Sequence, residues 1–315
     1  MLFRSQAVVG QRELIDSLFI GLLTNSHVLL EGVPGLAKTL MIRTLAEAIQ
    51  LSFRRIQFTP DLMPTDITGT EVLEEDASTG KRFFKFNKGP IFSNIILADE
   101  INRTPPKTQS ALLEAMQEFE VTYAGQTYPL QRPFFILATQ NPIEQAGTFP
   151  LPEAQLDRFL LFVQVGYPTE QDELGILEGT TGTRKVKIEP VLTGEEIIKI
   201  QQLVREVSIS RDLLAFVNQV VRATRPATTP SAFVKEWVRW GSGPRAGQAM
   251  VLTARARALL NGRFAVTLAD LQAVAYPVLR HRVLLNFKAE AKGITSDQVT
   301  ETLLNETKLP ATAVG

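Results

Sequence analysis

Gly32-Val-Pro-Gly-Leu-Ala-Lys-Thr39 follows the apolar run Val28 to Leu30, and this order of strand, glycine loop and Lys-Thr pair predicts the fold. A tight loop presents successive backbone N–H groups to phosphate oxygens, and the following helix adds its positive N-terminal end. Lys38 supplies a point charge, and the Thr39 hydroxyl supplies a ligand for Mg²⁺. The usual pattern has glycine before the lysine, where this chain has Ala37. The stretch is a nearly complete P-loop and predicts a nucleotide-binding protein.

The composition restricts the class of protein. At 315 residues the chain exceeds a typical domain, and its 44% hydrophobic content is enough for two cores. The 33 basic and 33 acidic residues cancel, so net charge provides no general attraction to nucleic acid or to an anionic membrane. No apolar run reaches the ~20 residues of a membrane helix, and no secretory leader is evident. We therefore expect a cytoplasmic protein without a membrane span.

Metal-binding side chains other than carboxylates are scarce. The chain has no cysteine, which excludes disulfides, thiolate metal sites and cysteine nucleophiles. Its two histidines, His27 and His281, are far apart in the sequence, which argues against a histidine-based zinc or iron site. Both histidines are expected to be packing or surface residues.

Three short apolar runs predict a parallel sheet. They are residues 28–30, 94–98 and 134–139, and helical patterns separate them, as is typical of buried parallel strands in an α/β layer. Ligands bind beyond the carboxyl ends of such strands. The P-loop, Asp99-Glu100 and Asn141 all follow strand ends, so we expect them to lie at one site.

Two segments depart from a plain doubly wound pattern, and each predicts an inserted β-hairpin. Residues 70–73 and 82–86 read as strands around a turn, and the alternation over 119–123 returns over 127–130. The second hairpin follows a helix expected over 108–118. It directly precedes the 134–139 strand.

Helical patterns take over from Thr169 and predict a second domain. We therefore expect an α/β domain over 1–166 and a smaller all-α lid domain with a C-terminal tail over 167–315. A short helix is expected around 232–240, and the C-terminal tail is expected to contain a helix over 296–307. The longer helices are expected over residues 170–178, 194–206, 211–222, 246–260 and 268–282.

Ile95-Ile-Leu-Ala-Asp99-Glu100 has the pattern of an ATPase strand that ends in two carboxylates. We expect Asp99 to hold Mg²⁺ through water, and Glu100 to polarise the water that attacks the γ-phosphate. Asn141 ends the next strand and can orient the same water by hydrogen bonding. No Asn-Lys-x-Asp guanine motif follows the P-loop, so ATP is the expected nucleotide.

These motifs resemble the MoxR family of AAA+ ATPases. The resemblance rests on the P-loop, on Ala98-Asp-Glu-Ile-Asn-Arg103 and on Ala138-Thr-Gln-Asn-Pro142, with further similarity over 57–69, 89–92 and 147–159. It covers roughly residues 5 to 285 and explains Ala37, because this family also has alanine there. It implies a P-loop AAA+ fold with a central parallel sheet, a helix-2 insert, a hairpin before sensor 1 and a helical lid. The same group includes magnesium chelatase motor subunits.

The resemblance implies a role for each matching residue. Lys38 and Thr39 are similar to the Walker A pair, Asp99 and Glu100 to the Walker B pair, and Asn141 to sensor 1. Arg158 resembles the arginine finger that reaches a neighbouring subunit's γ-phosphate, and Arg245 resembles sensor 2. Val9-Gly10-Gln11 resembles the segment near adenine. The nucleotide contacts implied are Gly10, Gln11, Gly32, Pro34, Gly35, Leu36, Ala37, Lys38, Thr39 and Leu40, with Mg²⁺ on Thr39 and Asp99.

The resemblance further implies a ring, hexameric in the family, that remodels, matures or activates client proteins together with a separate von Willebrand factor A partner. Three alternatives stay open. The first is a magnesium-chelatase-like motor for cofactor insertion. The second is a nucleic-acid motor, favoured by the basic segment 235–282 but by no nucleic-acid-binding motif. The third is a nucleotide-dependent switch with negligible turnover, against which Glu100, Asn141 and Arg158 argue together.

Overall fold

A computed structural model of the chain describes residues 12–32, 38–75, 78, 80–142, 147–167, 169–180 and 189–309. The chain divides into two compact units. The first comprises Met1–Leu18, His27–Leu151 and Gln164–Ile198, and the second comprises Phe19–Ser26, Pro152–Val163 and Lys199–Gly315. These units interleave in sequence. The single boundary near residue 166, which the change from strand to helical patterns predicts, stays a prediction.

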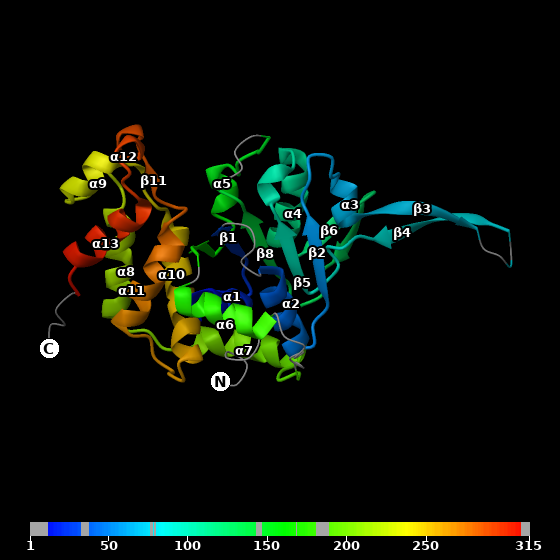
Figure 1. Cartoon of the computed structure of the whole chain (residues 1–315), viewed down its shortest axis with the longest axis horizontal. Coiled ribbons are helices and arrows are strands. Elements are labelled where there is room, and N and C mark those ends of the chain that lie inside the picture. The colour runs from blue at the N-terminus through cyan, green and yellow to red at the C-terminus, as the bar shows by residue number, and fades with distance from the viewer. Residues whose placement is uncertain are drawn as a thin grey trace. The chain divides into compact units, whose positions relative to one another are not determined.

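A five-stranded sheet confirms the predicted α/β layer, and three of its strands are the three apolar runs. Its order is β2-β5-β8-β1-β9 (Figure 1). The pairs β1–β8, β2–β5 and β5–β8 are parallel, and Ala138 of β8 lies between Leu29 and Ala98. Ile95 to Ala98 are fully buried, as expected for a strand covered on both faces. The strands are β1 (Val28–Gly32), β2 (Phe53–Gln57), β5 (Ile95–Asp99), β8 (Phe135–Gln140) and β9 (Leu161–Val165).

Helices of the α/β layer follow the expected periodicity. In α2, residues Met41, Ile42 and Leu45 are buried at helical spacing, so that this helix presents one apolar face to the core. The predicted helix over 108–118 is α4, which ends where Phe119 adopts a left-handed conformation. The helices up to residue 206 are α1 (Arg12–Leu23), α2 (Lys38–Ala48), α3 (Pro64–Thr68), the 3₁₀ helix Ile101–Arg103, α4 (Pro106–Glu118), α5 (Glu153–Leu156), α6 (Glu170–Thr180) and α7 (Gly194–Glu206).

Both predicted hairpins are present in the first unit. They are β3 (Gly69–Glu75) with β4 (Arg82–Lys88), and β6 (Glu120–Tyr123) with β7 (Gln126–Pro129). Phe86 of β4 stacks on Tyr128 of β7 with 4.4 Å between ring centroids, which joins the two hairpins. Gly69 begins β3 with φ of 105°, and a Cβ there would collide with the backbone of residues 87 and 89, so this base requires glycine.

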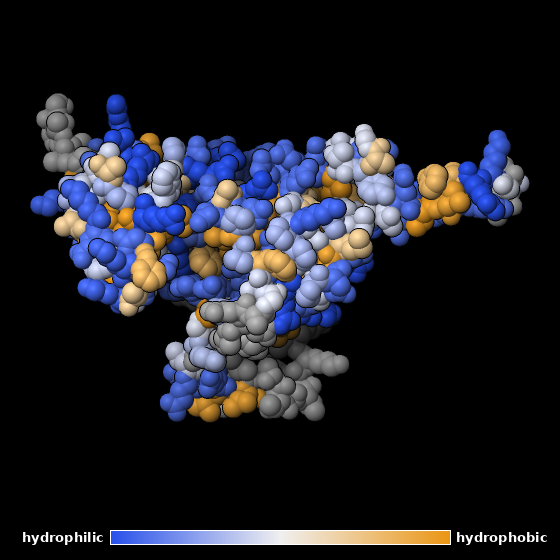
Figure 2. Space-filling model, turned by 90° about the horizontal axis from the view of Figure 1, so that it is seen from above, coloured by the Kyte–Doolittle hydropathy of each residue, from blue (hydrophilic) through white to orange (hydrophobic). Residues whose placement is uncertain are grey.

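The β3–β4 hairpin projects from the rest of its unit (Figure 1). Its outer part carries exposed apolar side chains, and Leu73 and Phe84 form a cross-strand pair that is 54% and 70% exposed, respectively. Figure 2 shows hydrophobic residues on this projection. A two-stranded ribbon with so little burial depends on its base, where Phe86 packs between the hairpins.

The helices predicted from residue 211 onward are present in the second unit, together with a short ribbon that the sequence did not predict. Of the two earlier helices assigned to the lid, α6 belongs to the first unit and α7 spans the division at residue 198. The region expected as one helix around 232–240 divides into a helix and a strand, and that strand pairs antiparallel with residues 284–285. The elements are α8 (Arg211–Ala223), α9 (Ala232–Trp237), β10 (Val238–Trp240), α10 (Pro244–Leu260), α11 (Leu268–Leu279), β11 (Leu284–Leu285), α12 (Phe287–Ala291) and α13 (Ser296–Glu306). No helix among the described residues is long and apolar enough to cross a membrane.

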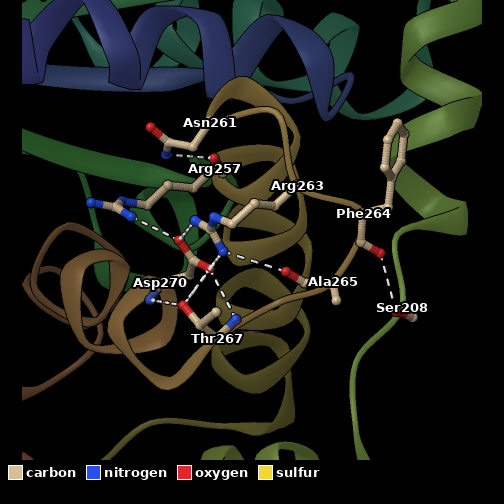
Figure 3. Close-up of polar contacts among 8 residues, drawn as sticks. All are labelled: Ser208, Arg257, Asn261, Arg263, Phe264, Ala265, Thr267 and Asp270. Carbon is tan, nitrogen blue, oxygen red and sulfur yellow. Dashed lines mark hydrogen bonds and ion pairs between the residues drawn. The ribbon is translucent and has the colours of Figure 1, made fainter.

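The fully buried carboxylate of Asp270 lies at the centre of a cluster of polar contacts in the second unit (Figure 3). Asp270 accepts two hydrogen bonds from Arg263, at 2.6 and 2.7 Å, and one from Arg257 at 2.7 Å. Its Oδ2 also accepts from the backbone N–H and the hydroxyl of Thr267, which caps α11. Burial opposes ionisation, but the bonds from Arg263, Thr267 and Arg257 outweigh it and hold the pKa of Asp270 well below its usual range.

Substituting this carboxylate by an amide should destabilise the second unit. We expect Asp270→Asn to lower its free energy of unfolding by about 3–5 kcal/mol, because two guanidinium groups lose their buried partner. Because folding lowers the pKa, the stabilisation is complete above the unfolded value of about 3.9 and is lost as pH falls through the folded value. The difference between the two proteins in denaturant unfolding should be equal at pH 7 and pH 5, and should begin to shrink only below about pH 4. Glu236→Gln, which changes an exposed carboxylate on α9, is the control; an equal effect of both would contradict the prediction.

Candidate functional site

A cavity of about 410 Å³ lies in the first unit at the carboxyl ends of β1, β2, β5 and β8. It collects six of the residues singled out from the sequence and four others. They are Gly32, Lys38, Thr39, Asp99, Glu100 and Asn141, with Arg55, Gln57, Thr139 and Gln140. Parallel strands place their carboxyl ends at one edge, which is why motifs about 100 residues apart in the chain meet here.

Lys38 begins α2 and points back over the end of β1. Its Nζ donates to the carbonyl of Gly32 at 2.6 Å. Burial lowers the pKa of Lys38, and the negative charges of Asp99 and Glu100 oppose this shift. Burial removes water from the Lys38 ammonium. Phosphate oxygens could replace this water as hydrogen-bond acceptors, so the partly buried ammonium is suited to binding an anion.

Both carboxylate oxygens of Asp99 have partners. Oδ1 accepts from the Thr139 hydroxyl at 2.6 Å. Oδ2 accepts from the guanidinium of Arg55, from Nη2 at 2.6 Å and from Nε at 3.0 Å. The register explains this pair, since Arg55 and Asp99 belong to the neighbouring parallel strands β2 and β5. Arg55 thus forms an ion pair with the carboxylate that the sequence predicted as a magnesium ligand.

Glu100 follows β5 in a left-handed conformation with φ of 58° and ψ of 49°. Its N–H donates to the Thr139 hydroxyl at 2.9 Å, so Thr139 connects the two acidic residues. Its Oε2 accepts from Gln57 at 2.8 Å and pairs with Arg103 at 3.3 Å. A non-glycine residue in this conformation costs free energy, which these contacts offset. The backbone turn directs the carboxylate into the cavity beside Lys38.

The remaining predicted residues fall in three groups. Asn141 is buried directly after β8 and lines the cavity, whereas Leu40 is an exposed residue on α2. Gly10, Gln11, Pro34, Gly35, Leu36 and Ala37 lie outside the described residues. Arg158 and Arg245 belong to the second unit.

Arg158 and Arg245 differ in their surroundings. Arg158 follows α5 and is partly buried, and its guanidinium has no hydrogen-bond or ion-pair partner within the described part of the chain. Arg245 lies in the first turn of α10, is mostly exposed and pairs with Asp157 at 3.1 Å. Asp157 is the residue before Arg158, so the two predicted arginines are near one another in the same unit.

The donor set fits a magnesium ion bound together with a nucleotide. Among the described residues no three His, Cys, Asp or Glu side chains gather as a metal cage. Mg²⁺, however, commonly takes one or two protein oxygens and completes its shell with phosphate and water. The Thr39 hydroxyl and the Asp99 carboxylate line the same cavity as Lys38, which matches that requirement.

Arg55 should compete with a cation for Asp99. We expect Arg55→Ala to lower the Mg²⁺ concentration needed for nucleotide binding by up to about fivefold, because a partly exposed ion pair contributes about 0.2–1 kcal/mol. Titration of Mg²⁺ at a fixed concentration of a fluorescent ATP analogue measures the midpoint. Arg54→Ala, which removes an exposed arginine from the same strand, is the matched control. An unchanged or higher midpoint in Arg55→Ala would show that Arg55 does not oppose the cation.

Comparison with known proteins agrees with this arrangement. Residues 27–161 match the ATPase family associated with various cellular activities (AAA), and residues 231–303 match the AAA lid domain. The chain is 43% identical to Chaperone MoxR1 of Mycobacterium tuberculosis over 96% of this chain and 79% of that protein. It is 30% identical to Protein MoxR of Paracoccus denitrificans over 89% of this chain and 86% of that protein.

A solved structure shares the fold. It is described as a putative ATPase from Cytophaga hutchinsonii, is 43% identical, and superposes with a TM-score of 0.90 over 97% of this chain and 92% of that one. The uncharacterized protein YeaC of Bacillus subtilis is also 43% identical, over 97% of this chain and 92% of its own length. The similarity therefore extends through both the α/β layer and the helical lid.

Proposed function

Because this chain belongs to the MoxR family of AAA+ ATPases, we propose that it hydrolyses ATP to ADP and phosphate and uses the cycle to remodel client proteins. One observation carries the catalytic part of the proposal. Lys38, Asp99, Glu100 and Asn141 face a single cavity of about 410 Å³ at the carboxyl edge of the sheet. This arrangement supports the proposal that phosphate binding, metal binding and water activation occur at one place.

Each side chain has a chemical task in the proposed reaction. Lys38 neutralises the phosphate oxygens, and Thr39 with Asp99 would hold Mg²⁺, which supplies further neutralisation of the charge on the transferred phosphoryl group. Glu100 polarises the attacking water and accepts its proton, which requires Gln57 to share or release its carboxylate. Asn141 orients the same water. Gly10, Gln11 and the 34–37 loop are proposed nucleotide contacts.

The proposed assembly is a homo-oligomeric ring, hexameric as in the family, in which Arg158 reaches the γ-phosphate of a neighbouring subunit and Arg245 senses the nucleotide. A guanidinium in that position is worth on the order of 10³–10⁵ in rate. An isolated subunit would therefore turn over slowly. The exposed apolar pair on the β3–β4 hairpin is a proposed contact for the client. A von Willebrand factor A protein is the proposed partner, and the cytoplasm the proposed compartment.

The lid gives little support to the nucleic-acid alternative. Most cations of the basic segment 235–282 are committed to carboxylates of their own unit. The committed pairs are Arg245 and Arg282 with Asp157, Arg257 and Arg263 with Asp270, and Arg280 with Asp297. Such pairs leave less charge for phosphates. The other alternative, a motor for cofactor insertion, would use the same ATPase site and would differ mainly in its client.

Phosphate release with ATP, with GTP and with ATP plus a chelator tests the catalytic proposal. We expect turnover with ATP that requires Mg²⁺ and is much weaker with GTP. Adding an unfolded model protein should raise the rate if remodelling is coupled to hydrolysis. Tight ATP binding without phosphate release at any protein concentration would refute the ATPase and leave the nucleotide switch.

A further inference from the structure

The turn that carries Arg158 is held by the lid helices of its own unit. Residues 152–160, which precede β9, cluster with the second compact unit. Phe159 in this turn is fully buried. Two consecutive residues that follow α11, His281 and Arg282, supply most of the polar contacts to the turn.

Arg282 makes an unusually complete set of hydrogen bonds for a buried guanidinium. Its Nε donates to Asp157 Oδ1 at 2.7 Å, and its Nη2 donates to the carbonyl of Phe159 at 2.7 Å. Its Nη1 donates to the carbonyls of Leu160 at 3.1 Å and Val278 at 2.6 Å. The Arg282 guanidinium thus forms hydrogen bonds with residues on both sides of Arg158 and with Val278 of α11.

The chemistry of this contact is specific to arginine. The Arg282 side chain is 4% exposed, and burial lowers its pKa while Asp157 raises it. Arginine remains charged in proteins, so its desolvation must be offset by a carboxylate and by carbonyl acceptors in the correct directions. His281 adds a hydrogen bond to the Phe159 carbonyl at 3.1 Å, and burial, with the charge of Arg282, lowers the pKa of His281. Neither residue reaches the nucleotide cavity lining.

We infer that Arg282 is a positioning residue for the arginine finger: it fixes the turn Asp157–Leu160 to the lid, so that Arg158 moves together with the lid of its own subunit. This inference rests on the proposed role of Arg158 as the finger. The backbone on either side of Arg158 is fastened, whereas its guanidinium has no partner in the described part of the chain, as a group that acts on a neighbouring subunit requires.

Asp157 extends the same connection to Arg245. Its Oδ2 pairs with Arg245 at 3.1 Å while Oδ1 pairs with Arg282 at 2.7 Å. If Arg245 turns to a phosphate, it must leave Asp157, and Arg282 then keeps the turn attached. The nucleotide bound by one subunit thereby influences, through its lid, the finger that the subunit offers to its neighbour.

Complementation between full-length variants tests the inference. We expect Arg282→Lys, which keeps the charge but loses the fork, to bind a fluorescent ATP analogue normally and to lose turnover by about tenfold to hundredfold, the size of effect that misplacing a catalytic group produces. Mixing it with Glu100→Gln, whose finger is intact, should restore part of the rate. Mixing it with Arg158→Ala should restore none, because neither subunit offers a placed finger.

The matched control is Arg257→Lys, which changes a lid arginine that contacts the Asp270 carboxylate and not the finger turn. It should retain turnover below its melting temperature. If Arg282→Lys does not fold, Asp157→Asn removes the ion pair with little change of shape. Its turnover should fall by less, and Glu100→Gln but not Arg158→Ala should restore part of it. Full turnover of the Arg282 variant, or restoration by Arg158→Ala, would overturn the inference. Failure of Glu100→Gln and Arg158→Ala to restore each other would instead reject the proposed shared site, and with it the inference.

Discussion

Glu100→Gln is expected to lower ATP turnover by about 10²–10⁴-fold while ATP binding is retained. The amide has the shape of the carboxylate and can still contact Gln57 and Arg103, so the backbone turn should persist. It cannot accept a proton from the attacking water, which is why hydrolysis and binding separate. Phosphate release and the affinity for a fluorescent ATP analogue are the two measurements.

Glu114→Gln provides the control for this variant, because Glu114 is an exposed carboxylate on α4 outside the cavity lining. It should match the unmodified protein in both measurements. Turnover of Glu100→Gln equal to that of the unmodified protein would assign proton acceptance to another group. Loss of ATP binding would mean that Glu100 maintains the shape of the cavity.

Arg158→Ala is expected to lower turnover by about 10³-fold or more, again without weakening ATP binding. The reason differs from that for Glu100, since Arg158 would act on a neighbour's nucleotide and not on its own. Its guanidinium makes no hydrogen bond or ion pair within the described residues, so the melting temperature should change little. Phosphate release at a saturating protein concentration and a thermal melt measure the two effects.

Arg239→Ala is a suitable control, because Arg239 is an exposed arginine on β10 of the same unit. It should leave turnover unchanged. If Arg158→Ala hydrolyses ATP at the normal rate, the shared-site mechanism is wrong and another cation must stabilise the transferred phosphoryl group. A large fall in melting temperature would indicate a structural role instead.

The central strands and the Walker residues could be predicted because each has a distinctive local sequence pattern. β5 and β8 are continuous apolar runs that end in Asp99-Glu100 and before Asn141. Lys38 and Thr39 follow a strand at P-loop spacing. Burial on both faces makes such strands hydrophobic without interruption, so a short window of sequence is enough to identify them.

Arg55 and Gln57 were missed because their strand has no such signal. β2 reads Phe-Arg-Arg-Ile-Gln, and within it Ile56 is buried while Arg54 and Arg55 are exposed. It is an edge strand of the five, and its place beside β5 follows from pairing and not from hydrophobicity. Once that register is known, Arg55 and Gln57 necessarily lie near Asp99 and Glu100.

The contacts of the second unit were beyond sequence reasoning for another reason. Arg282 meets Asp157 across 125 positions, and no local pattern indicates such a pair. The basic segment 235–282 looked like a surface charge patch, but folding directs Arg282 inward and pairs Arg257 and Arg263 with a buried Asp270. The sequence shows how many charged residues this segment has, but their ion-pair partners depend on tertiary packing.

The most direct test of the account mixes Glu100→Gln and Arg158→Ala subunits and measures phosphate release per subunit over a wide range of protein concentration. A Glu100→Gln subunit offers an intact finger, and an Arg158→Ala subunit offers an intact nucleotide site, so the mixture should hydrolyse ATP faster than either variant alone. The gain should disappear on dilution, because it requires contact between subunits. A mixture that never exceeds the average of its two components, at concentrations where the unmodified protein is active, would contradict a nucleotide site shared between subunits.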